Sequence, residues 1–298
     1  MTTKQFIKNT ALLATACLTF ISLNAKSAGK LATFKPFKQN KNFSAYFSSS
    51  TNLIADKNNS ERILGPPDTL KHFMSLGQAA YDSGQYKMAI GHFEAALQYA
   101  KTDSARSEIC TSIALAYLQE KNIASAMMYF SNAMKANSFA SKNFYGMSAC
   151  HLELFDIKNA LSFITMAIEL DPVNDFYYEQ RAQMHSMLWD YASALRDIST
   201  AINYNPAEAI YYGERGNFHV AMGEYGEAFN DFKSALIQAN SENIEYYKGF
   251  VDASKHLGNL QPCLDFLLLR NQNHPSEECR NAIAKVYSLM RNQGEQKK

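Results

Sequence analysis

Small and large apolar residues recur at fixed distances along most of this chain. The core of the pattern is an Ala, a large apolar residue four positions later and a second Ala three positions after that, as in Ala194, Ile198 and Ala201. This spacing places the three side chains on one face of an α-helix. Between residues 175 and 240 a longer pattern occurs twice, with every member 34 residues before its counterpart. The matched residues are Tyr178 and Tyr212, Arg181 and Arg215, Ala182 and Gly216, His185 and His219, Ala194 and Ala228, Ile198 and Phe232, and Ala201 and Ala235.

A fixed period of this length is typical of repeat proteins. Each copy runs from an aromatic residue through a small residue to a His, then to the core with its two alanines, and the first copy ends with Pro206. This order resembles the tetratricopeptide repeat (TPR), whose signature is W-x2-L-G-x2-Y, then A-x3-F, then P. The resemblance implies two antiparallel helices in each repeat. It also implies a function in binding another polypeptide.

Further copies of the core predict an all-α fold, a TPR solenoid of about six helix-pair repeats followed by a C-terminal capping helix. The sixth repeat is degenerate, because Cys263 and Leu267 stand at its core positions. Small residues such as Gly77 are predicted where two helices approach closely. The predicted repeats are residues 70–103, 107–140, 141–174, 175–208, 209–242 and 244–277, with the capping helix at residues 277–291.

Proline and glycine mark the ends of these helices. Pro172, Pro206 and Pro275 are predicted to follow second helices, because Pro cannot donate the helical hydrogen bond. Glycine is expected in the turn between the two helices of a repeat, where a positive φ angle is needed. The turn glycines are Gly84, Gly223 and Gly258.

Residues 1–27 are predicted to be a signal peptide or an N-terminal anchor. Lys4 and Lys8 precede an uncharged, apolar-rich run from residue 9 to residue 25, and small residues then offer a cleavage site. The run is short for a membrane span, which needs about 20 residues. A cleaved signal peptide predicts an exported protein, periplasmic or secreted. The alternatives are a membrane anchor, a lipid anchor on Cys17, and a mitochondrial presequence, against which the absence of Arg argues.

Residues 28–67 are predicted to be a flexible tether, because Lys, Asn and Ser dominate and no helical or alternating period is present. The aromatic residues of this segment allow a second interpretation, in which they dock on the solenoid or on a partner. The solenoid is assigned to residues 68–292, and residues 293–298 are predicted to form a disordered tail.

Charge is unevenly distributed, although the net charge of the chain is only +1. Residues 1–55 contain seven Lys and no Arg, Asp or Glu. The chain has 29 basic residues, so 22 of them accompany 28 acidic residues in the remainder, which has a net charge of −6. A mildly acidic repeat region is unfavourable for nucleic acid binding, so no nucleic acid partner is predicted.

No motif of a catalytic or cofactor site is present in the sequence. The phosphate-binding loop, the G-x-G-x-x-G fingerprint and the H-E-x-x-H zinc motif are all absent. We therefore predict no catalytic residues, no cofactor, no metal site and no enzyme activity. His151, His185 and His219 recur at one repeat position, but equivalent points on packed helices are about 8–10 Å apart. Ligands of one zinc ion lie much closer together, so these residues are predicted to replace the usual aromatic residue in the packing.

The five cysteines show no spacing typical of a metal site. They are Cys17, Cys110, Cys150, Cys263 and Cys279. Cys110, Cys150 and Cys263 fall at helix packing positions, where a free Cys behaves as a small apolar residue. In an oxidising compartment Cys263 and Cys279 could pair between adjacent helices.

The TPR resemblance also implies a binding face. In that family the first helices line a concave groove, and the second, fifth, ninth, twelfth and thirteenth positions of a repeat face the ligand. In this chain those positions hold apolar, aromatic and polar residues, a mixture that suits an extended or helical peptide. The TPR subtype that clamps a C-terminal carboxylate is not expected, because Met74, Gln78 and Leu115 replace its Lys and Asn residues. The groove residues carried over from the family are Gln78, Tyr81, Leu115, Leu118, Tyr145, Leu152, Phe176, Glu179, Gln183, Met187, Asn217, Val220, Lys248, Asp252 and Lys255.

Together these observations predict a non-catalytic TPR adaptor or scaffold that binds a protein or peptide partner through the concave groove. The alternative is a stable regulatory or substrate-presenting subunit of an enzyme or envelope complex, which would use a large permanent interface. No small-molecule cofactor is expected, and membrane contact is expected only if the N-terminal segment is retained.

Overall fold

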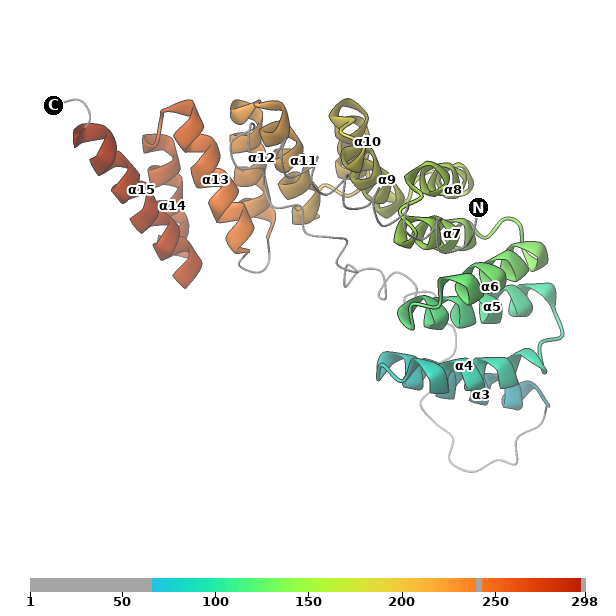
Figure 1. The fold of residues 1–298 in the computed structure, drawn as a ribbon. Coiled ribbons are helices and arrows are strands. Elements are labelled where there is room, and N and C mark those ends of the chain that lie inside the picture. Colours follow the sequence, from blue (N-terminus) through green and yellow to red (C-terminus); the bar gives the residue numbers. More distant parts are fainter. Residues whose placement is uncertain (1–65, 240–242, 296–298) are drawn as a thin grey trace, which may run out of the picture. The chain divides into compact units, whose positions relative to one another are not determined.

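The computed structural model describes residues 66–239 and 243–295. The predicted signal peptide or anchor, the tether up to residue 65 and the last three residues lie outside the described residues. Thirteen helices and no strands are present in the described part of the chain (Figure 1). The helices are α3 (Pro66–Asp82), α4 (Tyr86–Leu97), α5 (Asp103–Gln119), α6 (Ile123–Ala136), α7 (Ser141–Glu153), α8 (Ile157–Leu170), α9 (Asp175–Met187), α10 (Tyr191–Tyr204), α11 (Ala209–Met222), α12 (Tyr225–Gln238), α13 (Ile244–Leu257), α14 (Gln261–Asn273) and α15 (Glu277–Glu295).

The helices pack in sequential pairs, which confirms the predicted solenoid of six repeats and a capping helix. From α3 to α12 each odd-numbered helix packs against the next helix, and each even-numbered helix packs against the first helix of the following pair. The final helix, α15, packs on both α13 and α14. All of the described helices belong to one compact unit. Second helices α8, α10 and α14 end two residues before Pro172, Pro206 and Pro275, as predicted.

Small residues allow the helices of a pair to approach closely. A Cβ atom added at Gly77 would lie 2.5 Å from the Phe93 ring, and one added at Gly216 would lie 3.2 Å from the Phe232 ring. The large residue of the Ala-containing core therefore fills the space that the glycine leaves open. The predicted close-approach positions are confirmed at both repeats.

The turns inside the pairs share one backbone conformation. Gly84, Gly223 and Gly258 have φ angles of +75°, +77° and +70°, as the sequence predicts. The three remaining repeats adopt the same conformation without glycine, which the sequence does not predict. The residues at these turns are Lys121, Phe155 and Trp189, with φ angles of 60°, 58° and 62°.

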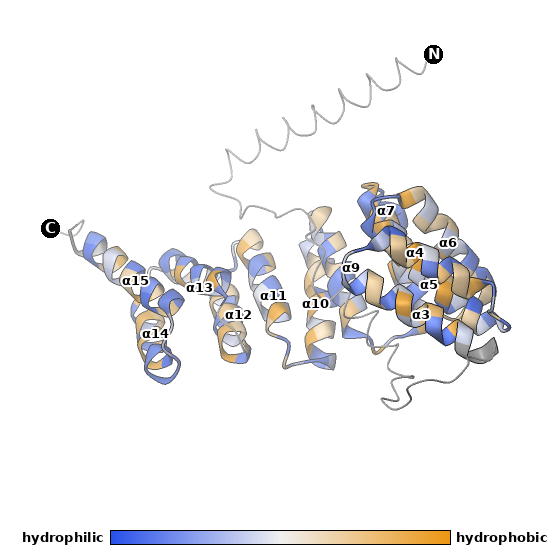
Figure 2. Ribbon diagram, turned by 90° about the horizontal axis from the view of Figure 1, so that it is seen from below, coloured by the Kyte–Doolittle hydropathy of each residue, from blue (hydrophilic) through white to orange (hydrophobic). Residues whose placement is uncertain are grey.

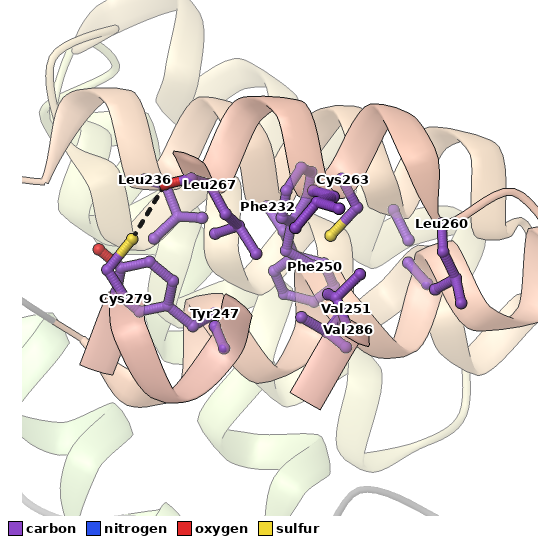
Figure 3. Packing of buried hydrophobic residues seen from close by; sticks show 14 residues of the cluster. Phe232, Leu236, Tyr247, Phe250, Val251, Leu260, Cys263, Leu267, Cys279 and Val286 are labelled. Atoms are coloured by element: carbon purple, nitrogen blue, oxygen red, sulfur yellow. Dashed lines mark hydrogen bonds between the residues drawn. The ribbon is translucent and has the colours of Figure 1, made fainter. Parts of the chain in front are cut away.

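The C-terminal core is closed by the capping helix. Figure 3 shows Val286 of α15 among side chains of α12, α13 and α14, and Val286 has no exposed surface. Cys263 and Cys279 are free and buried, and Figure 3 shows their sulfur atoms on separate sides of this cluster. The Cys279 thiol donates a hydrogen bond of 3.3 Å to the Leu267 carbonyl, so the structure contains no Cys263–Cys279 pair.

Hydrophilic and hydrophobic residues are mixed along the described helices, as Figure 2 shows. Among the described residues, no helix combines the length and the apolar character that a membrane span requires.

Candidate interaction face on the first helices

The first helices carry all of the groove residues that the family resemblance implies, but the structure exposes them very differently. Six are buried, namely Leu115, Leu118, Tyr145, Leu152, Phe176 and Glu179. Five are half-buried, namely Gln78, Tyr81, Gln183, Met187 and Val220. Four are exposed, namely Asn217, Lys248, Asp252 and Lys255. Accessible side chains at these positions are thus concentrated on α9, α11 and α13, which we call the C-terminal face.

Aromatic packing explains why the middle of the predicted face is buried. The centroid of the Tyr145 ring on α7 lies 5.3 Å from that of Phe176 and 5.6 Å from that of Tyr177, both on α9. These side chains fill the joint between two repeats, where they contribute apolar burial and ring contacts. A ligand-binding role for Tyr145 and Phe176 stays a prediction, and their packing role is what the structure shows.

Hydrogen bonds between equivalent positions join successive first helices. The Tyr177 hydroxyl of α9 donates to Ser141 Oγ of α7 at 3.1 Å, and the Tyr211 hydroxyl of α11 donates to Asp175 Oδ2 of α9 at 2.8 Å. Both pairs are 36 residues apart. The repeat period contains the signal for these bonds, because it places a donor two positions further along in the next repeat, but the sequence analysis did not identify them.

In the fourth and in the fifth repeat, an ion pair between an arginine and a buried aspartate joins the first helix to the second. Arg181 makes two hydrogen bonds of 2.8 Å to Asp197, and Arg215 makes bonds of 2.9 Å and 2.7 Å to Asp231. The two-point geometry matches the fork of a guanidinium to a carboxylate. Sequence comparison of the two repeats singled out both arginines, but it assigned them no partner.

The three repeating histidines each contact an acidic residue of their own repeat. The Nδ1 atoms lie 3.1 Å from Asp156 for His151, 3.5 Å from Asp190 for His185, and 2.6 Å from Glu224 for His219. The His151 ring also stacks on Phe163, with a centroid distance of 5.2 Å, as expected for a packing role. Within the described residues, no group of three or more His, Cys, Asp and Glu side chains could hold a metal ion. The acids were missed because they lie in the turns, outside the repeat signature. Asp156 and Asp190 also accept hydrogen bonds from the backbone amides of Asn159 and Ser193.

Two carboxyl groups converge within the C-terminal face. Glu179 on α9 is only 1% exposed, and Gln183 Nε2 donates to its Oε1 at 2.5 Å. The same nitrogen donates to Oε1 of Glu214 on α11 at 2.7 Å. Gln180 Nε2 donates to Oε2 of Glu179 at 2.6 Å. We call Glu179 and Glu214 the carboxyl pair; the amide of Gln183 lies between its two members.

Burial raises the pKa of both members of the carboxyl pair. Burial raises the pKa of Glu179 well above its ordinary value, and the negative charges of Glu214 and Asp175 raise it further. Burial also raises the pKa of Glu214, to about 7, against hydrogen bonds that lower it. Tyr211 is close to Asp175 and Glu179, and burial followed by its bond to Asp175 raises the pKa of this phenol. The pair therefore holds a proton more tightly than exposed carboxyl groups do, and the site is rich in hydrogen-bond acceptors.

Sequence reasoning found only part of this site. Glu179 and Gln183 stand at ligand-facing positions of the TPR pattern. Glu214 stands directly after a ligand-facing position of the next repeat, so it was missed. A signal was available in the sequence. Gln180 occupies the same position one repeat earlier, 34 residues before Glu214, and is also polar.

A second surface feature involves second helix α8 and the turn that follows α9. An open surface hollow is lined by Lys158, Leu161, Ser162, Thr165, Met166 and Glu169 of α8 together with Leu188. Leu188 is 50% exposed and adjoins Trp189, which is 61% exposed. In the preceding turn, Leu154 and Phe155 are 55% and 83% exposed. Two neighbouring turns thus present large apolar side chains to solvent.

Comparisons with known proteins agree with this architecture. Residues 107–139, which contain most of α5 and all of α6, match the model of the tetratricopeptide repeat family. The solved structure of pilF from Pseudomonas aeruginosa is 14% identical, with a TM-score of 0.58, and the match covers 74% of this chain and 100% of that one. A tetratricopeptide repeat protein from Parabacteroides merdae ATCC 43184 is 12% identical, with a TM-score of 0.53, covering 74% and 93%. MamA from Desulfovibrio magneticus RS-1 is 16% identical, with a TM-score of 0.50, covering 57% and 95%. These identities show a shared fold and nothing more, and no curated protein sequence matches the chain.

Proposed function

Because this chain is a tetratricopeptide repeat protein, we propose that it is a non-catalytic adaptor that binds a protein or peptide partner on its C-terminal face. The observation that carries the proposal is the accessibility of α9, α11 and α13. Met187 and Val220 are half-buried there, and Asn217, Lys248 and Asp252 are exposed. Such a mixture of partly covered apolar side chains and accessible polar groups suits recognition of a peptide segment.

The three helices form a continuous support for a ligand. The bond between Gln183 and Glu214 joins α9 to α11. Gly213 of α11 faces the ring of Tyr246 on α13 so closely that a Cβ atom would overlap it. A binding face built on packed helices is held more rigidly than one built on loops.

The test uses exposed residues, so that folding is unaffected. Asn217→Arg combined with Asp252→Arg changes the proposed face, and Asn230→Arg combined with Asp265→Arg makes the same changes on second helices α12 and α14. Tagged protein is captured from its native cell in wild-type and both variant forms. A partner lost only with the first variant supports binding on the C-terminal face. Equal recovery with both variants would move the interface elsewhere.

A stable subunit of an enzyme or envelope complex is the second candidate, and the exposed apolar turns favour it. Phe155 and Trp189 are large, accessible side chains outside the C-terminal face, and exposed apolar patches mark interaction sites. Under this function a partner co-purifies at a fixed ratio, survives the Asn217/Asp252 change and is lost when Phe155 and Trp189 are replaced by Ser. Retention of the partner in that Ser variant argues against a subunit interface at these turns.

We also propose that the protein is exported, on the basis of the signal-like pattern in residues 1–27. The intact mass of the protein from its native cell tests this. A mass lacking about 25 residues at the N-terminus supports cleavage after export. A full-length chain favours a retained anchor or a different location.

A further inference from the structure

We propose that the carboxyl pair is a binding site for a basic side chain of the partner, a lysine ammonium or an arginine guanidinium. This inference rests on the proposed adaptor function, because it names the chemistry that the C-terminal face recognises. It also predicts a property of the free protein, described below, that is measured without any partner.

The hydrogen bonds of the carboxyl pair are incomplete. Gln180 and Gln183 donate to Glu179, and Gln183 donates to Glu214. The two carboxyl groups also share a hydrogen bond with each other, which requires a proton on one of them. Glu214 as a residue is half-buried, yet its Oε2 atom is cut off from solvent and accepts no hydrogen bond from an amide, a hydroxyl or a basic group. A buried oxygen without a donor is costly and is uncommon in native proteins. A ligand with several N–H groups would satisfy it.

No cation of the described chain neutralises the site. Asp175, Glu179, Glu208 and Glu214 influence one another or the same tyrosines, Tyr211 and Tyr246, at short range. Within the described residues no Lys or Arg forms an ion pair with any of these four acids. The neighbouring Arg215 is already paired with Asp231. In the free protein a proton held by the carboxyl pair therefore offsets its charge where α9 meets α11, and a basic ligand would take the place of that proton.

Gln183 occupies the position that a cation would take. Its Nε2 atom donates to one oxygen of each carboxyl group, at 2.5 Å and 2.7 Å. A neutral amide makes these two bonds without supplying charge, whereas an ammonium supplies three donors and a guanidinium five. Gln183 is half-buried, so its side chain reaches the surface through which a partner residue would enter. A basic side chain displacing this amide would bind both carboxylates and offer a donor to Glu214 Oε2.

The free protein provides the first test. Gln183→Lys places an ammonium one bond further along the side chain, whereas Gln183→Met is an apolar substitution of similar length. We expect the Lys variant to unfold at a higher temperature than the Met variant at pH 7.5, and the difference to vanish when Glu179 and Glu214 are both replaced by Gln. This double-mutant comparison isolates the interaction of the ammonium with the carboxyl pair. A Lys variant no more stable than the Met variant would overturn the cation site.

The second test measures specificity with a displayed library of random 12-residue peptides. Peptides selected on wild-type protein are expected to contain Lys or Arg at one aligned position, and their affinity is expected to fall roughly 10- to 100-fold with Gln183→Lys and with the Glu179/Glu214 double Gln variant. The control, Glu227→Gln, changes an exposed acid on second helix α12 and should leave the affinity unchanged.

The outcomes separate the two proposals. Peptides that bind the C-terminal face without a basic position would leave the adaptor function standing and refute the cation site. Peptides whose basic residue tolerates Gln183→Lys would also refute it. A library without any binder would count against both. The relative enrichment of Lys and Arg then tells which cation the site prefers.

Discussion

At the scale of single residues, the carboxyl pair links the interaction face to protonation. A carboxyl group with a raised pKa holds its proton more tightly in the folded protein than in the unfolded chain. The folded protein is therefore relatively more stable below the unfolded pKa, and it loses this stability as the pH rises through the folded pKa. For Glu214 the range runs from 4.5 to about 7. The titratable groups around the pair are Asp175, Glu208, Tyr211 and Tyr246.

Replacing Glu179 by Gln should flatten this loss of stability, because one of the two buried acids no longer ionises. The free energy of unfolding of Glu179→Gln should exceed that of wild type at pH 8 by about 1–3 kcal/mol, with a smaller difference at pH 5. Urea unfolding at pH 5, 6.5 and 8 measures the change, with Glu227→Gln as the control. Parallel pH profiles for Glu179→Gln and wild type would show that the pair does not ionise as described.

Backbone conformation makes a second prediction at this scale. Phe155 is 83% exposed and has a φ angle of 58°, so its side chain adds little packing in a conformation that L-residues disfavour. Phe155→Gly should raise the free energy of unfolding by about 0.5–1 kcal/mol. The reciprocal change, Gly84→Ala at a φ angle of +75° and with open space around it, should lower it by about 1 kcal/mol. Thermal unfolding checks both, and a less stable Phe155→Gly protein would indicate that the Phe side chain contributes packing.

At the scale of helices, glycine has opposite effects at two positions. A Cβ atom at Gly146 of α7 would overlap the ring of Phe130 on α6, whereas one at Gly91 of α4 would meet nothing within 4 Å. Gly146→Ala should therefore destabilise the protein by about 1–3 kcal/mol. Gly91→Ala should stabilise it by about 1 kcal/mol, because Ala favours the helix. Chemical unfolding of the two variants side by side tests whether helix spacing or helix propensity decides the outcome; equal changes in both would contradict this account.

The helices themselves were largely predictable from sequence, because apolar spacing and the 34-residue period both report local geometry. Pro172 and Gly84, for example, mark a helix end and a turn with the expected conformations. The turn at Trp189 was not predictable, because no side-chain rule identifies a left-handed Trp. The carboxyl pair was missed for a different reason. Glu179 and Glu214 come from different repeats, and their encounter depends on the rotation of α9 against α11, which no spacing within one repeat specifies.

At the scale of the whole described stack, each helix pair packs mainly against the neighbouring pairs. The unfolding caused by a destabilising substitution should therefore remain near the substituted pair. Val286 of α15 has no exposed surface and contacts the core of the C-terminal helices, whereas the adjacent Tyr287 is 49% exposed. Val286→Asp buries an unpaired charge and should open α13, α14 and α15, while Tyr287→Asp should change little. Hydrogen exchange followed by mass spectrometry should show faster exchange in residues 244–295 of the Val286 variant and unchanged protection in residues 66–170.

The same experiment bears on function. If α13 unfolds in Val286→Asp, the C-terminal face loses Lys248 and Asp252, whereas Glu179 and Gln183 on α9 keep their positions. A partner that depends on the whole face should then bind more weakly. The stability difference between Gln183→Lys and Gln183→Met should shrink in the Val286→Asp background, because Tyr246 of α13 packs on Gly213 beside Glu214. Faster exchange throughout the described helices would instead mean that the repeats unfold as one cooperative unit. In that case the change at the carboxyl pair would come from unfolding of the whole stack and not from the opening of α13, which contacts both α11 and α15.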